Sequence, residues 1–231
     1  MDEGNGNPDL PAWETNAEHW DDYMGDDSNE WHRDLVRPGV TALLDPHPGE
    51  RILDIACGNG NYSAYLADMG VMVTAFDFSP RMVGLARRRR QHTMVPVDFR
   101  VADASDAEDI ASLGEPGGFD KAVCNMGFMD ISDIGTLLAG IHRLLAPGGT
   151  LVFATQHPCF VTLTDLYLTP HTYLGDAIPG QPVPHNYHHR SLQDIMGACF
   201  KTGFIVNGLM ETGFPGKEIP EILIVRARAE R

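Results

Sequence analysis

The sequence predicts an α/β protein with a doubly wound, mostly parallel sheet and helices on both faces. Short apolar runs rich in β-branched residues recur five times between residues 51 and 155, and segments with helical patterning separate them. This alternation is typical of parallel sheets, whose strands are connected by helices. The first run ends in the turn Cys57-Gly58-Asn59-Gly60, directly before a predicted helix. A strand, a glycine-rich turn and a helix N-terminus together favour a site for a nucleotide-like ligand.

Each predicted strand is a short apolar run bounded by turn residues. Ile52, Leu53 and Ile55 mark the first strand, and Asp54 is the charged residue among them. Two further runs after residue 200, joined by a segment rich in proline and glycine, read as the last two strands. Strands are predicted at residues 51–55, 71–76, 97–101, 119–125, 150–155, 204–210 and 221–227.

The predicted helices are bounded by capping and stop signals. Ser79 precedes Pro80, which suits an N-cap followed by proline in the first turn. Ser132 or Asp133 is placed to cap a later helix, and Pro38-Gly39 is expected to interrupt an earlier one. Helices are predicted at residues 29–44, 62–69, 80–90, 106–113, 133–145 and 191–201.

The chain is long enough for one large domain, which we expect over residues 49–231. Residues 1–15 are rich in Gly, Asn, Pro and Asp, so we predict a disordered tail there. Residues 16–48 are expected to form a helical, aromatic cover over either the core or a ligand. Residues 156–190 interrupt the alternation with five prolines and five histidines, which predicts an insertion on the substrate side.

Composition narrows the class of protein. The formal charge is 17 − 32 = −15, and so acidic a surface repels nucleic acids and anionic membranes, so neither is expected as a partner. The chain has no run of 18 uncharged apolar residues and no apolar leader near its start. Its four cysteines show no C-x-x-C pairing, which is typical of reduced thiols. We therefore expect a cytoplasmic protein; the oligomeric state stays open.

The residues around the glycine turn indicate which ligand it holds. A dinucleotide fingerprint, G-x-G-x-x-G, would need a third glycine where this chain has Ser63. Asp77 ends the second strand, 17 residues after Gly60, where a carboxylate can accept both hydroxyls of a ribose. Asp54 is costly in an apolar strand unless it contacts the turn amides or a ligand ammonium. A dinucleotide site has no obvious need for Asp54.

Five segments in succession carry a more specific pattern. They are residues 53–60 (LDIACGNG), 76–82 (FDFSPRM), 102–104 (ADA), 119–126 (FDKAVCNM) and 144–152 (LLAPGGTLV). At these residues the chain resembles the class I S-adenosylmethionine-dependent methyltransferases. The resemblance implies a seven-stranded sheet whose last strand is antiparallel to the rest. It also implies S-adenosyl-L-methionine as cofactor and S-adenosyl-L-homocysteine as product.

The resemblance further implies a role for each matching position along the cofactor. Asp54 would contact the turn or the ammonium. Ala56, Gly58 and Gly60 would lie beside the methionine part, and Asp77 would hold the ribose. The residues expected at the adenine are Phe78, Met82, Asp103 and Ala104, and those expected at the sulfonium end are Asn125 and Met126.

The methyl acceptor is expected beyond the carboxyl ends of the fourth and fifth strands, because open α/β sheets bind ligands at that edge. Tyr23 from the cover, Met129 and Phe160 are the predicted substrate-binding residues. The candidates that follow the two strands directly are Met126, Phe128, Met129, Asp130, Gln156, His157, Pro158 and Phe160.

Histidines supply the predicted catalytic groups. His157 is the best-placed general base, and His188 and His189 are second candidates, since imidazole exchanges a proton near neutral pH. A base is optional and helps where the acceptor is a hydroxyl. The histidine and cysteine spacings match no zinc pattern, so no metal is predicted.

The sequence thus predicts a methyltransferase that moves a methyl group to a small-molecule acceptor by in-line displacement. Two alternatives stay open. One is a nucleic-acid or protein methyltransferase that docks through Arg87-Arg88-Arg89-Arg90, although arginines in a last helical turn also suit the helix dipole. The other is a non-catalytic module that keeps the cofactor-binding fold.

Overall fold

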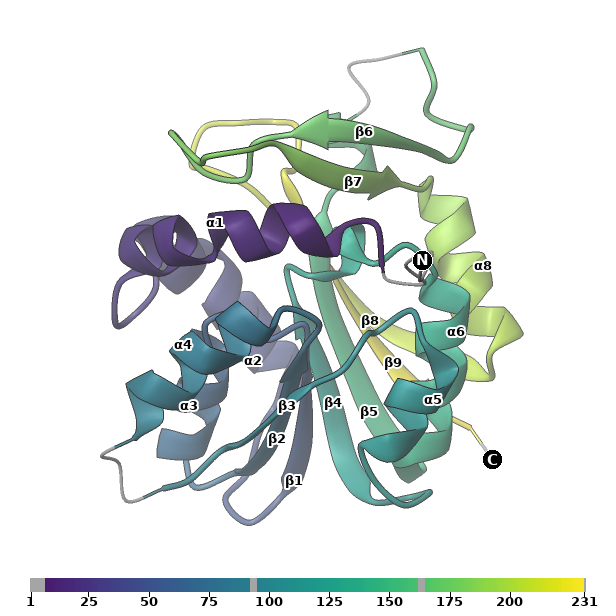
Figure 1. Ribbon diagram of the computed structural model, residues 1–231. Coiled ribbons are helices and arrows are strands. Elements are labelled where there is room, and N and C mark those ends of the chain that lie inside the picture. Colours follow the sequence, from purple (N-terminus) through teal and green to yellow (C-terminus); the bar gives the residue numbers. More distant parts are fainter. Residues whose placement is uncertain (1–6, 92–94, 162–164, 231) are drawn as a thin grey trace, which may run out of the picture.

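The computed structural model describes residues 7–91, 95–161 and 165–230, with the side chains of residues 160 and 161 left out. A seven-stranded sheet lies at its centre (Figure 1), in the order β3-β2-β1-β4-β5-β9-β8. Within this seven-stranded sheet, the described pairs that involve β9 are antiparallel and the others are parallel, so the predicted mostly parallel sheet with an antiparallel last strand is confirmed. The strands are β1 (Arg51–Ile55), β2 (Met72–Asp77), β3 (Asp98–Val101), β4 (Phe119–Asn125), β5 (Leu145–Gln156), β8 (Phe204–Thr212) and β9 (Ile222–Ala229).

Helices cover both faces of this sheet, as the alternating pattern predicts (Figure 1). One face carries α2 (Arg37–Leu44), α3 (Asn61–Asp68) and α4 (Pro80–Arg90), and the other carries α5 (Ala107–Ser112), α6 (Ile134–Leu144) and α8 (Leu192–Lys201). Ile52 of β1 packs on the face with α2, α3 and α4, whereas Leu53 and Ile55 pack on the opposite face. All three side chains are fully buried.

Side-chain caps begin several of these helices where the sequence places them. Oγ of Ser79 accepts from the backbone N–H of Met82 at 3.1 Å, which confirms the predicted cap of α4. Of the two candidates for α6, Asp133 is the cap: it accepts from the amides of Gly135 and Thr136. Local hydrogen bonds therefore set these helix starts.

The interruption expected at Pro38-Gly39 takes a different form. A π-helical turn, η1 (Trp31–Val36), leads directly into α2, and Pro38 lies in the first turn of α2, where its missing N–H is tolerated. Gly39 has a packing role, since a Cβ there would lie 2.6 Å from Cδ1 of Ile224 in β9. Glycine therefore lets α2 approach the sheet closely.

The prediction of a disordered tail over residues 1–15 is wrong for its second half. Helix α1 (Leu10–Met24) begins well before residue 16, with Pro11 in its first turn. Asp9 is buried just ahead of the helix, and its carboxylate accepts from Nδ2 of Asn186 at 2.6 Å. Contacts with a segment that is distant in the sequence thus order residues whose composition resembles a tail.

The insertion at residues 156–190 has structure of its own. It contains α7 (Pro158–Val161) and a hairpin of β6 (His171–Gly175) and β7 (His185–His189), in which Tyr173 pairs with Tyr187. Figure 1 shows α1 and this hairpin together across one end of the central sheet. That end is the carboxyl edge of the parallel strands, where α/β proteins bind ligands.

Candidate functional site

A cavity of about 420 Å³ lies at this edge. Small-molecule sites measure about 300–1,000 Å³, so its size suits a cofactor or metabolite. Residues that follow β1, β2 and β4 contribute to its floor, including Ala56, Phe78 and Met126, and residues of α1 and the β6–β7 connection contribute to its roof.

Two buried carboxyl groups stand at the ends of neighbouring strands in this floor. Asp54 of β1 accepts a hydrogen bond of 2.6 Å from Oγ of Ser63 in α3, so the serine in place of a third glycine ties the helix to the strand. Asp77 of β2 accepts from the backbone N–H groups of Gly58 and Ser79, both at 2.9 Å. Both carboxylates keep lone pairs for a ligand donor.

Burial dominates the electrostatics of these two groups. It raises the pKa of Asp54 to about 7 and that of Asp77 to about 6, against an ordinary value of 3.8. Hydrogen bonds to Ser63, Gly58 and Ser79 oppose the effect without cancelling it. A ligand that donates hydrogen bonds or brings a positive charge would stabilise the ionised forms.

The backbone is strained where the chain leaves β1 and β4. Ala56 and Met126 each follow a strand directly and have φ of 52° and 63°. Residues other than glycine rarely adopt this left-handed region. A Cβ on Gly127 would lie 2.7 Å from Cβ of Ala56, so the two turns touch. Strain of this kind concentrates at ligand sites, because the surrounding structure must hold it in place.

Two amide oxygens beside the cavity lack a hydrogen-bond partner among the described residues. They are Oδ1 of Asn61 and Oδ1 of Asn125, and both are buried. Nδ2 of Asn61 donates to the carbonyl of Gly25 at 3.1 Å, so the amide is oriented by the chain. Buried acceptors are almost always paired in folded proteins, so these two indicate a donor on a ligand or a bound water.

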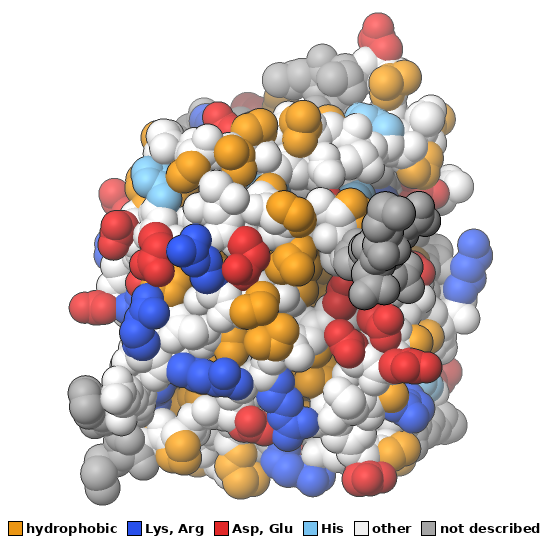
Figure 2. Space-filling model, in the orientation of Figure 1, with side chains coloured by type: hydrophobic (Ala, Val, Ile, Leu, Met, Phe, Trp, Pro, Cys, Tyr) orange, Lys and Arg blue, Asp and Glu red, His pale blue; other side chains and the backbone are white. Residues whose placement is uncertain are grey.

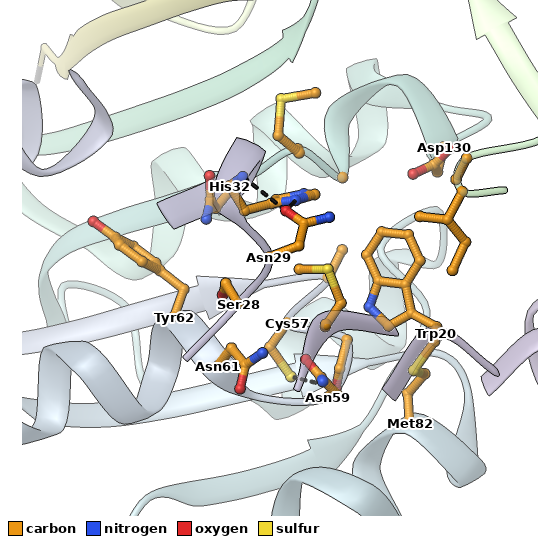
Figure 3. Close-up of a pocket in the computed structure, with 18 of the residues that line it drawn as sticks. Trp20, Ser28, Asn29, His32, Cys57, Asn59, Asn61, Tyr62, Met82 and Asp130 are labelled. Atoms are coloured by element: carbon orange, nitrogen blue, oxygen red, sulfur yellow. Dashed lines mark hydrogen bonds between the residues drawn. The ribbon is translucent and has the colours of Figure 1, made fainter. Parts of the chain in front are cut away.

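Aromatic rings contribute to the cavity wall, and Figure 3 shows two of them, Tyr62 and Trp20, on opposite sides of His32. Trp13 and Trp20 of α1 meet edge to face, with ring centroids 5.5 Å apart, and both pack on a small cluster around Met82 of α4. Trp20 and Trp31 each contact the ring of His32, at 5.9 and 4.7 Å between centroids. The aromatic cover therefore faces the cavity as well as the protein core.

Most residues predicted to bind cofactor or substrate do line this cavity. Those present in the lining are Tyr23, Asp54, Ala56, Gly58, Asp77, Phe78, Met82, Asn125, Met126 and Met129. Asp130 and Gln156, expected after the fourth and fifth strands, also line it. Phe128 does not, because its ring stacks on Phe153 in the core with centroids 4.2 Å apart. The side chain of Phe160 lies outside the described residues.

Three predicted cofactor residues lie outside the lining. Gly60 has a packing role, since a Cβ there would lie 2.8 Å from Cβ of Ala86 in α4. Asp103 accepts from Nδ2 of Asn7 at 2.8 Å, so the segment before α1 covers it. Ala104 is buried in the hydrophobic core.

The three predicted catalytic histidines are also outside the lining. Nε2 of His157 lies 2.8 Å from a carboxylate oxygen of Glu211, and its Nδ1 accepts from the amide of Cys159. Gln156, the last residue of β5, lines the cavity, whereas His157 follows the strand and its ring contacts Glu211 of β8. His188 and His189 are held by Asp9 and by a backbone carbonyl of the insertion. None of the three histidines therefore lines this cavity, and their catalytic role stays a prediction.

Two other groups at the cavity carry chemistry that the sequence did not single out as catalytic. His32, held by Asn29, lines it from η1. Burial raises the pKa of Asp130, and its Oδ1 lies 3.5 Å from Nε2 of His185 in β7. Asn29 and His32 are spaced like a helix N-cap and the third residue of that helix. This spacing is the sequence signal that could have paired Asn29 with His32.

The four arginines that end α4 are engaged within the chain. Arg89 pairs with Asp21 and Asp26 at 2.5 and 2.6 Å, and Arg90 pairs with Asp68 at 3.0 Å. Arg88 lies 3.5 Å from a carboxylate oxygen of Glu18, and Arg87 donates to a backbone carbonyl of β3. Figure 2 shows such basic side chains interleaved with acidic ones on this face. The run is thus a set of intramolecular ion pairs and helix-terminal cations.

Two searches of the described residues bear on other ligands. Within residues 7–91, 95–161 and 165–230, no group of three or more His, Cys, Asp or Glu side chains is arranged to hold a metal ion. Among the helices of the same residues, none is long and apolar enough to cross a membrane.

Comparisons with known proteins agree with this geometry. Residues 52–149 match a family model described as a methyltransferase domain. The ubiquinone biosynthesis O-methyltransferase of Xanthomonas campestris pv. campestris (strain B100) is 34% identical over 139 residues, which cover 60% of this chain and 56% of that protein. The chain therefore spans about half the length of the curated relatives it matches.

Solved structures show the same fold at low sequence identity. An S-adenosylmethionine dependent methyltransferase from Mesorhizobium loti aligns with a TM-score of 0.62 and 22% identity, over 83% of this chain and 96% of that one. The 1,6-didemethyltoxoflavin-N1-methyltransferase of Burkholderia thailandensis aligns with a TM-score of 0.63 and 21% identity, over 100% and 94%. The family match, the strand order of the sheet and these likenesses agree: residues 52–149 match a methyltransferase domain, and the chain has the fold of class I S-adenosylmethionine-dependent methyltransferases.

Proposed function

We propose that this protein transfers the methyl group of S-adenosyl-L-methionine to a small-molecule acceptor by in-line displacement. The observation that carries the proposal is the convergence of Asp54, Asp77 and Asn125, from three adjacent strands, on one cavity. S-adenosyl-L-homocysteine is the product that remains.

The residues present fit this cofactor. The oxygens of Asn61 and Asn125 lack partners among the described residues. That of Asn61 suits the ammonium of the methionine part, and that of Asn125 would face the sulfonium end. Asp77 would accept from the ribose hydroxyls while it keeps its bonds to the Gly58 and Ser79 amides. When bound, the cofactor supplies an electrophilic methyl group. Phe78 and Met82 would flank the adenine, and Asp54 would balance the positive charge.

Other features support a small acceptor. Helix α1 and the β6–β7 hairpin lie over one end of the sheet (Figure 1) and contribute residues to the cavity lining, so they narrow the access of a large polymer. The Burkholderia structure contains a small heterocyclic acceptor and S-adenosylhomocysteine, and it aligns over the whole of this chain. The chain's part in catalysis would be to align the acceptor with the methyl group and to exclude water, which lowers barriers by several kcal/mol in favourable cases.

The alternative of a nucleic-acid methyltransferase has less support. Its expected docking residues, Arg87 to Arg90, are paired with acidic side chains or backbone carbonyls of the same chain. The net charge of −15 opposes contact with phosphates. Salt-dependent binding to tRNA would revive this alternative.

Two measurements test the proposal. Isothermal titration should show binding of S-adenosyl-L-homocysteine and none of NAD. Incubation with radiolabelled S-adenosyl-L-methionine and a cell extract should place label in the small-molecule fraction, not in protein or nucleic acid. Binding of NAD alone would reject the cofactor, and cofactor binding without any transfer would leave a non-catalytic module.

A further inference from the structure

His32 occupies a distinctive position in the cavity wall. It lies in η1, next to Asn29, and Figure 3 shows both side chains between Tyr62 and Trp20. The ring is held edge to face by Trp20 and Trp31, with interplanar angles of 83° and 73°. Its orientation is therefore set by packing, before any ligand arrives.

The hydrogen bonds of Asn29 determine where the ring carries its proton. Oδ1 of Asn29 accepts from the backbone N–H of His32 at 2.9 Å and lies 3.0 Å from Nδ1 of the same residue. A backbone N–H can only donate, so the amide atom between them must be the oxygen. An oxygen of an amide can only accept, so Nδ1 of His32 carries a hydrogen. In the neutral ring, Nε2 then holds a free lone pair.

The surroundings keep the ring neutral. Burial lowers the pKa of His32 to about 4, so the imidazole is uncharged near neutral pH. The backbone N–H and Nδ1 of His32 contact Asn29, whereas Nε2 makes no hydrogen bond to a residue that the structure describes. It is the ring atom left for a bound molecule.

We infer that His32 is the group that accepts the proton of a hydroxyl-bearing, planar acceptor, and that Asn29 positions it. The inference rests on the proposed methyl transfer and narrows it to O-methylation. The aromatic walls formed by Trp20 and Trp31 suit a flat ring, and the unprotonated Nε2 suits an O–H donor. Unlike the histidines at 157, 188 and 189, His32 lines the cavity.

The proposed step balances. The acceptor oxygen forms a bond to the methyl carbon as the carbon–sulfur bond breaks, and the electron pair of that bond passes to sulfur. The hydroxyl proton passes to Nε2 of His32, which later releases it to water. A hydroxyl oxygen becomes strongly acidic as it gains the methyl group, so even the weak base of a buried imidazole can take its proton.

The first experiment reads the ring directly. In protein labelled with ¹⁵N-histidine, NMR should show Nδ1 of His32 protonated and Nε2 unprotonated at pH 7. The signals of His32 are assigned as those missing from the His32→Gln variant. With saturating S-adenosyl-L-homocysteine, catechol should shift the Nε2 resonance, whereas the shape-matched o-phenylenediamine should shift it much less. A protonated Nε2, no response to catechol, or a full response to S-adenosyl-L-homocysteine alone would overturn the inference.

The second experiment compares turnover with cofactor affinity. His32→Gln should reduce kcat for methyl transfer to catechol by about 100-fold or more, the scale of a lost general base. Asn29→Ala should reduce it less, since the ring remains but loses its tautomer anchor. His47→Gln, an exposed histidine in the loop before β1, is the matched control and should equal wild type.

The dissociation constant for S-adenosyl-L-homocysteine separates two kinds of failure. It should be unchanged in His32→Gln and Asn29→Ala. If the cofactor product binds the wild type and only its affinity changes in the variants, His32 serves the cofactor site and the inference fails. If the product does not bind the wild-type protein at all, the proposed function itself fails.

Discussion

Nε2 of His188 in β7 lies 2.9 Å from Oδ2 of Asp9, just ahead of α1, and both side chains are largely buried. Asn186 donates to the other carboxylate oxygen at 2.6 Å. This cluster joins the two parts of the cavity roof, which are far apart in the sequence. Burial acts to raise the pKa of Asp9, but the hydrogen bonds from His188 and Asn186 outweigh it and lower the pKa below 3.8.

Asp9→Ala should therefore loosen α1 from the hairpin. We expect faster amide hydrogen exchange in residues 10–24, with unchanged protection in β1 and β4, because the core does not depend on this contact. Asp22→Ala, an exposed carboxylate on the same helix, is the control and should leave exchange unchanged. The pH dependence has a definite sign: a lowered carboxyl pKa stabilises the contact above pH 3.8, and the contribution is lost as pH falls through the lower value. Equal exchange in Asp9→Ala and wild type would show that the contact does not hold the roof.

Asp77→Ala should weaken binding of S-adenosyl-L-homocysteine about tenfold or more, the scale of lost hydrogen bonds to a charged group. The reason is that Asp77 would accept from the ribose and also orients the Gly58 amide. Isothermal titration measures the affinity, and the melting temperature checks that the variant is folded. A folded Asp77→Ala protein with wild-type affinity would mean that the ribose lies elsewhere.

Asp54→Asn should change how stability depends on pH. Burial raises the pKa of Asp54 from 3.8 to about 7, so the folded state holds this proton more tightly than the unfolded chain does. The free energy of unfolding of the ligand-free protein should then fall as pH rises from about 4 to about 7. Asp77, with a pKa of about 6, adds to the lower part of this range. The asparagine variant should flatten the curve between pH 6 and 7 in urea titrations, and parallel curves for both proteins would contradict the assignment.

His157→Ala distinguishes the sequence hypothesis from the structure. A catalytic His157 would lose turnover with unchanged cofactor affinity. The structure places the ring against Glu211, outside the cavity lining, so we expect a lower melting temperature and an unchanged kcat per folded molecule. Glu211→Gln should lower the melting temperature in the same direction. A large loss of kcat at full folding would restore His157 as the base.

The sequence by itself determined the elements whose signals are local. The alternation of apolar runs with capped helices located the five parallel strands, and the cap at Ser79 was readable from neighbouring residues. Asp54 stood out because a carboxylate inside an apolar strand needs a polar partner, and the structure supplies Ser63 nine residues later. Such features depend on contacts within one strand–turn–helix unit, where chain order and spatial order coincide.

Only the tertiary structure decided what closes the cavity and which histidine faces it. Asp9 and His188 are 179 positions apart, and no sequence pattern near either residue predicts their contact. Whether a histidine faces a ligand depends on the direction of its strand and on distant partners, as with His157 and Glu211, which are 54 positions apart. His32 of η1 lines the same cavity as Ala56 and Met126, which follow β1 and β4, although it is far from Met126 in the sequence. Long-range packing sets these orientations, and local composition carries little information about it.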